Sequence, residues 1–104
     1  VASLDGLGLS GPVKLIKMDV EGAEPMVLRG GRDLIARDRP LILIEVFEDL
    51  LRIVSRTDVA GLATLIGELD YRVHALVDGV TGEPIEDMTT VGVGKPSNVV
   101  LVPA

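Results

Sequence analysis

The sequence predicts an α/β fold, and two observations support this. Short apolar segments typical of strands alternate with segments in which apolar residues recur at helical spacing. The segment Leu41–Val46 is almost continuously apolar, as are strands that are buried on both faces of a parallel sheet. We therefore expect parallel strands with helices on both sides of the sheet, and a single domain over residues 1–104.

The composition excludes several classes of protein. The net charge is -6, and the ten Lys and Arg residues are scattered, so the basic surface of a nucleic-acid or anionic-membrane binder is missing. Without cysteine, disulfides and cysteine nucleophiles are excluded. The first residues resemble no signal peptide, and no apolar run reaches the roughly 20 residues of a membrane span. We expect a cytoplasmic protein.

The first half of the chain predicts a lead-in segment, a strand and a helix. Residues 1–12 form the lead-in, and Val13–Met18 is a short strand. A helix follows from Pro25, which suits a first helical turn, to about Arg37, before Pro40 ends it. Gly30-Gly31 inside this helix indicates either close approach by a neighbouring element or an irregular helix.

The second half predicts two further strands after Leu41–Val46. Phe47–Val54 is ambiguous and is compatible with a short helical turn. Asp58 then caps an amphipathic helix that continues to Leu69. Tyr71–Val77 is a strand, 78–97 a loop rich in turn residues, and Asn98–Val102 the last strand. These last two strands have no helix between them and should pair antiparallel.

Acidic residues gather where two predicted strands end. Asp19, Glu21 and Glu24 follow the first strand, and Glu45, Glu48 and Asp49 end or follow the next. In open α/β sheets, ligands bind outside the carboxyl ends of the strands. Carboxylates placed there can take a proton from a hydroxyl or hold a hard cation through oxygen ligands. The pattern favours a functional role for Asp19 and Glu45, whereas service to a helix dipole or plain solvation explains the other four.

The segment Leu15–Glu24 carries the sequence LIKMDVEGAE, whose K-x-D-V-E-G-A-E block resembles the FkbM-type methyltransferase family. Val27–Gly31, Arg39–Val46 and Asn98–Pro103 are similar to that family as well, so the resemblance covers nearly the whole chain. It implies methyl transfer from S-adenosylmethionine to a hydroxyl of a sugar, a lipid or a polyketide-like small molecule.

The resemblance also implies a place for this chain within a larger fold. Members of the family have a Rossmann-like class I sheet of seven strands, with the last strand antiparallel and inserted. Our strands correspond to its fourth to seventh strands. The first two strands, which build most of the cofactor pocket, have no counterpart here. The chain thus resembles the C-terminal half of the domain, and we expect it to be inactive in isolation.

The resemblance assigns roles to three acidic residues. Asp19 and Glu21 would lie at the active-site rim near the acceptor, with Asp19 also touching the cofactor, and Glu45 at the neighbouring strand end. Many relatives have a histidine where this chain has Phe47. Our hypothesis is that Asp19, aided by Glu21, receives or orients the acceptor hydroxyl. We predict no metal site.

A second interpretation is a non-catalytic α/β interaction module. An open sheet edge at Val13–Met18 would invite pairing with another chain, so we predict a homo-oligomer that forms through this edge.

Overall fold

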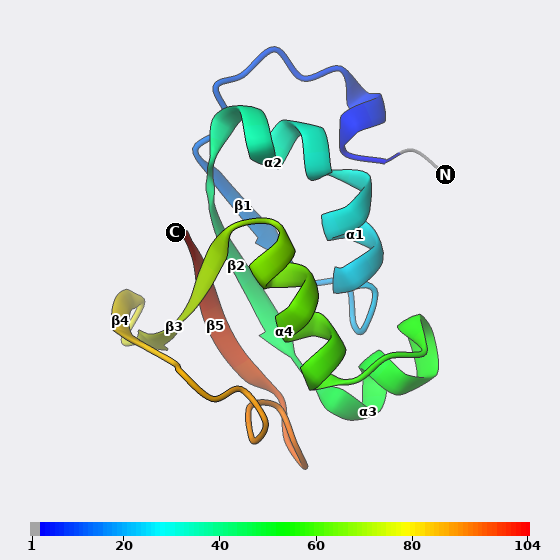
Figure 1. The fold of residues 1–104 in the computed structure, drawn as a ribbon, viewed down its shortest axis with the longest axis vertical. Helices are drawn as coiled ribbons and strands as arrows, with labels where there is room; N and C mark the ends of the chain where they lie inside the picture. Colours follow the sequence, from blue (N-terminus) through cyan, green and yellow to red (C-terminus); the bar gives the residue numbers. More distant parts are fainter. Residues whose placement is uncertain (1–2) are drawn as a thin grey trace.

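The computed structural model describes residues 3–104 and has a five-stranded sheet with helices packed on one face (Figure 1). The first two residues of the predicted lead-in segment lie outside the described residues. The strands are β1 (Leu15–Met18), β2 (Leu41–Val46), β3 (Tyr71–Val77), β4 (Val80–Pro84) and β5 (Ser97–Pro103). The helices are α1 (Glu24–Gly30), α2 (Arg32–Asp38), α3 (Glu48–Leu50) and α4 (Val59–Glu68), with a 3-10 turn at Asp5–Leu7 and a π-helical segment at Leu51–Ser55. The predicted mixed α/β class is confirmed.

The strands lie in the order β1-β2-β5-β3-β4. β1 and β2 are parallel, and their last paired residues are Met18 and Ile44. β5 lies between β2 and β3 and runs antiparallel to both, with Leu101 paired to Val73. The prediction of an antiparallel last strand is therefore confirmed, and this strand is inserted between two strands that precede it in the sequence.

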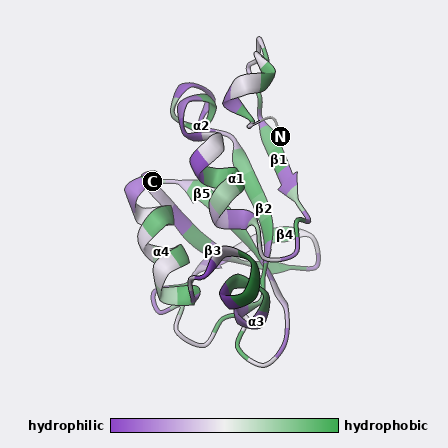
Figure 2. Cartoon of the chain, turned by 90° about the vertical axis from the view of Figure 1, so that its right-hand side faces the viewer, coloured by the Kyte–Doolittle hydropathy of each residue, from purple (hydrophilic) through white to green (hydrophobic). Residues whose placement is uncertain are grey.

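The expectation of helices on both sides of the sheet is wrong for the described residues. Figure 2 shows α1, α2 and α4 on one side of the strands. Along β2, Ile42 and Ile44 are buried under these helices, whereas Leu41 is exposed and Leu43 is half-buried on the opposite, helix-free face. A continuous apolar run indicates that both faces of a strand can be buried, but it does not indicate which segment covers each face.

The predicted single helix from Pro25 to Arg37 is two helices, α1 and α2, separated at Gly31. A Cβ added to Gly31 would lie 2.8 Å from Cδ1 of Leu4, and one on Gly30 would lie 3.0 Å from Cβ of Ser3. Both interpretations of the glycine pair are therefore correct, because the lead-in segment approaches closely and the helix is interrupted.

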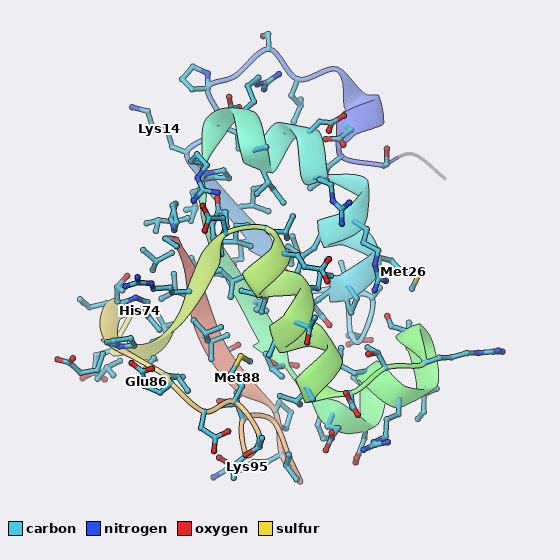
Figure 3. All side chains as sticks on the ribbon, in the orientation of Figure 1. Lys14, Met26, His74, Glu86, Met88 and Lys95 are labelled. Atoms are coloured by element: carbon cyan, nitrogen blue, oxygen red, sulfur yellow. The ribbon has the colours of Figure 1, made fainter. Side chains whose placement is uncertain are left out.

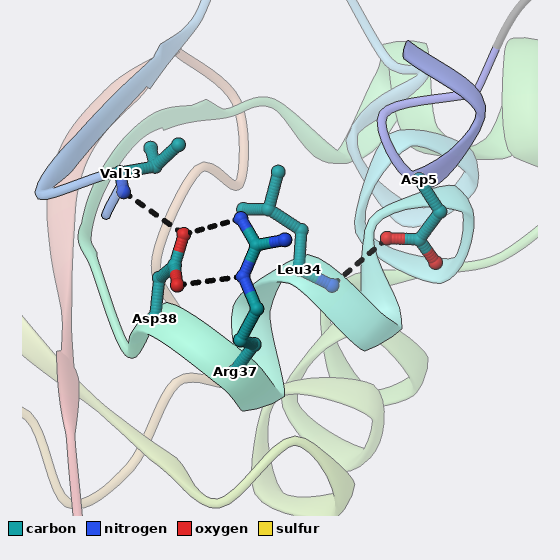
Figure 4. A network of polar contacts seen from close by, with 5 residues as sticks. All are labelled: Asp5, Val13, Leu34, Arg37 and Asp38. Atoms are coloured by element: carbon teal, nitrogen blue, oxygen red, sulfur yellow. Dashed lines mark hydrogen bonds and ion pairs between the residues drawn. The ribbon is translucent and has the colours of Figure 1, made fainter. Parts of the chain in front are cut away.

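The lead-in segment is also tied to α2 by hydrogen bonds. The Asp5 carboxylate accepts from the backbone N–H of Asp33 (3.1 Å) and of Leu34 (2.9 Å), which satisfies donors at the start of α2 (Figure 4). At the other end of α2, Asp38 accepts from the backbone N–H of Val13 (2.9 Å) and pairs with Arg37. These bonds fix the chain that enters β1.

The structure defines two segments after β2 that the sequence left open or described only as a loop. The ambiguous Phe47–Val54 region is helical from Glu48 onward, in agreement with a short helical turn, and α3 continues there into the π-helical segment. The expected loop 78–97 contains β4, which forms a hairpin with β3. Nδ1 of His74 lies 2.9 Å from the carbonyl oxygen of Gly82 across this hairpin. β4 is mostly exposed and poor in apolar residues, so the hydrophobic pattern did not reveal it.

The core fills the space between the sheet and the helices. Asp58 caps α4 as predicted, and its Oδ1 accepts from the Gly61 N–H at 2.8 Å. The fully buried apolar side chains include Leu28, Ile35, Ile42, Ile44, Val46, Leu51, Val59, Leu62, Ile66, Val99 and Leu101. Within residues 3–104, none of the helices has the length and apolarity that crossing a bilayer requires.

Candidate functional site

The carboxyl ends of β1 and β2 meet at one edge of the sheet. The last paired residues are Met18 and Ile44, and Asp19 and Glu45 come directly after them. The structure therefore brings the backbone positions of Asp19 and Glu45 together, as the sequence led us to expect. Asp19 is exposed to solvent and Glu45 is half-buried. We call this edge, with its carboxylates, the acidic rim.

Glu21 lies in a tight turn between β1 and α1. The Ala23 N–H donates to the Val20 carbonyl at 3.2 Å, and the two central residues have positive φ, 48° at Glu21 and 100° at Gly22. Glycine is required at the second position because a Cβ there would lie 2.5 Å from the Leu50 carbonyl oxygen. Glu21 is exposed, and a left-handed backbone costs a non-glycine residue roughly 1–2 kcal/mol. Such strain persists where surrounding contacts enforce it.

Glu24 is the residue that sequence reasoning placed differently. Its side chain is 1% exposed, and its Oε1 and Oε2 accept from the Gly22 N–H at 3.1 and 3.4 Å. Burial raises the pKa of this carboxyl, backbone donors at residues 24, 22 and 20 oppose the rise, and Glu45 adds to it by repulsion. The sequence predicted a residue that serves the helix dipole. Glu21 and Glu24 both precede or begin the helix, and no signal in the sequence marks one of them as buried.

The π-helical segment after β2 packs against the turn that holds Glu21. The Ser55 hydroxyl donates to the Gly22 carbonyl at 2.6 Å. Glu48 is occupied by local structure, because its Oε1 accepts from Arg52 at 3.3 Å and from the Val59 N–H at 3.4 Å. The expectation that Glu48 is simply solvated is therefore wrong, because its side chain is only 19% exposed and accepts two hydrogen bonds.

The segment before β5 closes over the end of β2. The Glu48 N–H donates to the Gly92 carbonyl at 2.9 Å, and a Cβ on Gly92 would overlap the carbonyl of Val46. Phe47, which directly precedes α3, is half-buried. The described part of the rim therefore offers carboxylates as its proton acceptors.

Two hollows flank the sheet. A hollow of about 180 Å³ lies beside the rim, and its lining includes Lys17, Leu43 and Asn98, the last of which pairs with Glu45 across β2 and β5. A larger one of about 480 Å³ lies between α4, β3 and the segment that carries Glu86 and Met88 (Figure 3). Because its Tyr71 lies at the start of β3, this hollow includes the end of the sheet opposite the rim.

The chemistry available at the rim is that of exposed carboxylates. Asp19 and Glu21 can accept a proton or a hydrogen bond from a hydroxyl, and their negative charge favours a cationic ligand. Among residues 3–104, no group of three or more His, Cys, Asp or Glu side chains is arranged to hold a metal ion.

Comparison with known proteins identifies the family. A family model described as the methyltransferase FkbM domain matches residues 1–73, which include Asp19, Glu21, Glu24, Glu45 and Ser55. Searches of curated proteins and of solved structures gave no match. The matched residues make up more than half of the chain and contain both strand ends of the acidic rim, so the chain belongs to the FkbM methyltransferase family.

Proposed function

We propose that the protein is part of an S-adenosylmethionine-dependent methyltransferase that methylates a hydroxyl on a small molecule such as a sugar, a lipid or a polyketide-like product. One observation supports this most directly. The family match spans the acidic rim, where Asp19 and Glu45 follow the paired ends of two parallel strands. Exposed carboxylates at this place in an α/β sheet suit a reaction in which a hydroxyl loses its proton.

The described residues fit one side of the cofactor. S-adenosylmethionine carries positive charge on its sulfonium and on its ammonium group, and the exposed Asp19 is a suitable partner for either. The neighbouring hollow of about 180 Å³ is smaller than the about 300–1,000 Å³ of ordinary small-molecule pockets. We therefore place most of the pocket outside these residues, which would correspond to the fourth to seventh strands of a class I methyltransferase sheet. On this proposal, the chain in isolation is inactive.

When bound, S-adenosylmethionine would supply an electrophilic methyl group and leave as S-adenosylhomocysteine. Asp19 accepts a hydrogen bond from the acceptor hydroxyl and takes up its proton as the oxygen becomes methylated. Glu21 orients the same hydroxyl from the turn, and Glu45 offers a further acceptor from the neighbouring strand end. Most of the rate enhancement comes from orientation and from the exclusion of water, so the rigidity of this edge matters.

Calorimetric titration with S-adenosylhomocysteine tests the proposal. It compares the 104-residue chain with the protein at the full length that its gene encodes. Binding by the longer form alone is the expected result. A folded longer form that does not bind S-adenosylhomocysteine would overturn the enzyme proposal. Equally tight binding by the 104-residue chain would overturn the proposal that most of the cofactor pocket lies outside it.

Substitution of Asp19 tests its role in the longer enzyme. Asp19→Asn keeps the size of the side chain but removes the proton acceptor, and we expect kcat to fall by about 10²–10⁴-fold. Asp49→Asn is a matched control, because Asp49 is also exposed and lies in α3, which follows β2. An Asp19→Asn enzyme that keeps its fold and its rate would remove this residue from the mechanism.

The interaction-module interpretation is the weaker one, since the family match supports a methyltransferase. The predicted self-association does not depend on this choice, because it would follow from the open edge of β1.

A further inference from the structure

The backbone of Gly22 is held through both of its polar groups, the N–H and the carbonyl. On one side, the Glu24 carboxylate accepts from the Gly22 N–H. On the other, the Ser55 hydroxyl donates to the Gly22 carbonyl at 2.6 Å. The Leu50 carbonyl leaves no room for a Cβ on this residue, so the backbone is also packed tightly. We call Glu24, Gly22 and Ser55 the Gly22 clamp.

This clamp joins the two strand ends that carry the acidic rim. Glu24 begins α1, directly after the turn that follows β1, whereas Ser55 ends the π-helical segment that follows β2. A bond from each to the backbone of the same residue fixes the turn relative to both strands. Glu21 precedes Gly22 in that turn, and Asp19 lies two residues further back.

We propose that Glu24 is a positioning residue, whose buried carboxylate holds the Gly22 peptide and so sets the direction in which Asp19 and Glu21 face. The consequence for catalysis rests on the function proposed above. Glu24 itself is too deeply buried to touch an acceptor, so it acts through the turn.

The burial of Glu24 supports a positioning role over simple service to the helix dipole. An exposed acid in the first turn of a helix already interacts with the dipole, without losing its hydration. A carboxylate that is 1% exposed gives up that hydration, and uncompensated burial of charge is strongly unfavourable. In the described part of the chain, Glu24 is the buried charged side chain, and its compensation comes from backbone donors of the turn itself.

The carboxylate also suits its backbone donor best. The Gly22 N–H donates to both of its oxygens, and Glu45 on β2 is near enough to repel it. A carboxylate accepts on both oxygens, whereas the amide of glutamine accepts on one and places an NH₂ donor where the other stood. Glu24→Gln therefore keeps the size of the side chain while it weakens the hold on the turn.

The first test measures the Gly22 clamp directly and does not require catalytic activity. In the protein at its full encoded length, labelled with ¹⁵N-glycine, we expect the Gly22 amide resonance to titrate with Glu24. In Glu24→Gln this titration should vanish, and exchange of the Gly22 amide hydrogen should become at least ten-fold faster. If Glu24→Gln fails to fold, Ser55→Ala is the second variant. It removes the hydrogen bond to the Gly22 carbonyl and should also accelerate exchange of the Gly22 amide hydrogen. An unchanged Gly22 amide in the folded variant would overturn the proposal.

The second test reads the consequence for catalysis. We expect Glu24→Gln to lower kcat at least ten-fold while the KM for S-adenosylmethionine changes less than three-fold, since misorientation affects the reacting geometry more than binding. Ile35→Val, a core change in α2 of comparable effect on thermal stability, is the control and should leave kcat unchanged. Equal losses of kcat in the two variants would reduce Glu24 to a structural residue and overturn the proposal.

The two tests also separate this proposal from the proposed function. A wild-type protein whose Gly22 amide titrates with Glu24, but which transfers no methyl group, would contradict the proposed function and leave the clamp standing. If the wild type transfers a methyl group but its Gly22 amide does not respond to the titration of Glu24, the clamp alone would be contradicted.

Discussion

Single carboxylates in this protein differ because their surroundings differ. Asp38 faces the Arg37 guanidinium, with two contacts of 2.7 Å, and the backbone N–H of Val13, and these partners lower its pKa to about 2 (Figure 4). Glu24 is buried, no cation pairs with it among residues 3–104, and desolvation raises its pKa above the ordinary 4.5. The surroundings of Asp38 therefore favour its charged form, whereas burial disfavours the charged form of Glu24.

The pKa of Glu24 is raised and that of Asp38 is lowered, so pH should affect stability in opposite directions through these two residues. Because the pKa of Glu24 is raised in the folded state, that state binds more protons than the unfolded one above about 4.5, and the free energy of unfolding should fall as pH rises through the folded pKa. Urea denaturation between pH 4.5 and 7.5 should show this slope in the wild type. Glu24→Gln should lack it, while Glu68→Gln, at an exposed position, should retain it. Identical slopes in wild type and Glu24→Gln would contradict the prediction.

Asp38 acts in the other direction and at lower pH. Its lowered pKa means that its contribution to stability is complete above the ordinary value of 3.8 and is lost as pH falls toward about 2.

Replacing two of the glycines by alanine should change the stability of the protein in opposite directions. Gly22→Ala should destabilise the protein by more than about 1–2 kcal/mol, because its φ of 100° disfavours a side chain and a Cβ would collide with the Leu50 carbonyl. Gly67→Ala, within α4 and with nothing within 4 Å of the new Cβ, should instead stabilise it by about 0.5–1 kcal/mol. Thermal denaturation of both variants checks the contrast, and equal effects would contradict it.

The elements of this fold are anchored at their ends by side chains from near and far in the sequence. α4 is capped by Asp58, the residue that directly precedes it, whereas α2 is capped by Asp5 from the distant lead-in segment. The near cap can be predicted from a local pattern. The distant one depends on how the lead-in packs against Gly30 and Gly31, and only the folded chain reveals it.

The cap of α4 gives a prediction at the scale of one helix. Asp58→Ala should lower the free energy of unfolding by about 1 kcal/mol, since the Gly61 N–H loses its acceptor. Asp58→Asn retains an acceptor oxygen and should be close to wild type in urea denaturation. If Asp58→Asn lowers the free energy of unfolding as much as Asp58→Ala, then charge, and not the hydrogen bond, stabilises this helix end.

The whole molecule has an open edge and an open face. Within residues 3–104, β1 pairs with β2 alone, so the backbone groups along its other side are free to pair with another strand. Leu15 on β1 is 57% exposed, and Leu41 on the helix-free face of β2 is 39% exposed. We propose that the isolated chain self-associates through β1.

Sedimentation across a range of concentrations tests this self-association. We expect the mean mass to rise with concentration, and Leu15→Lys to suppress the rise because a charge would interrupt the apolar edge. Ile53→Lys is the control, since Ile53 is 75% exposed but lies in the π-helical segment. A chain that stays monomeric at high concentration would contradict the proposed edge.

The local patterns of the sequence were enough for much of the fold and for part of the site. The strands near Val13–Met18, Leu41–Val46 and Tyr71–Val77, and the Asp58 cap, follow from apolar spacing and turn chemistry that operate within a few residues. The placement of Asp19 and Glu45 at one edge of the sheet follows because parallel strands end together. β4 was missed because an exposed, mostly polar strand carries no hydrophobic period.

The sequence by itself determined the α/β class, the antiparallel last strand and the acids at the strand ends, since hydrophobic spacing and chain order act locally. Only the tertiary structure decided that the described helices cover one face of the sheet, that Gly31 divides α1 from α2, and that Glu24 is buried while Glu21 is exposed. The physical reason is the same in each case. Burial and hydrogen bonding depend on neighbours distant in the chain, such as Leu4, Leu50 and Ser55, and these are brought close by packing alone.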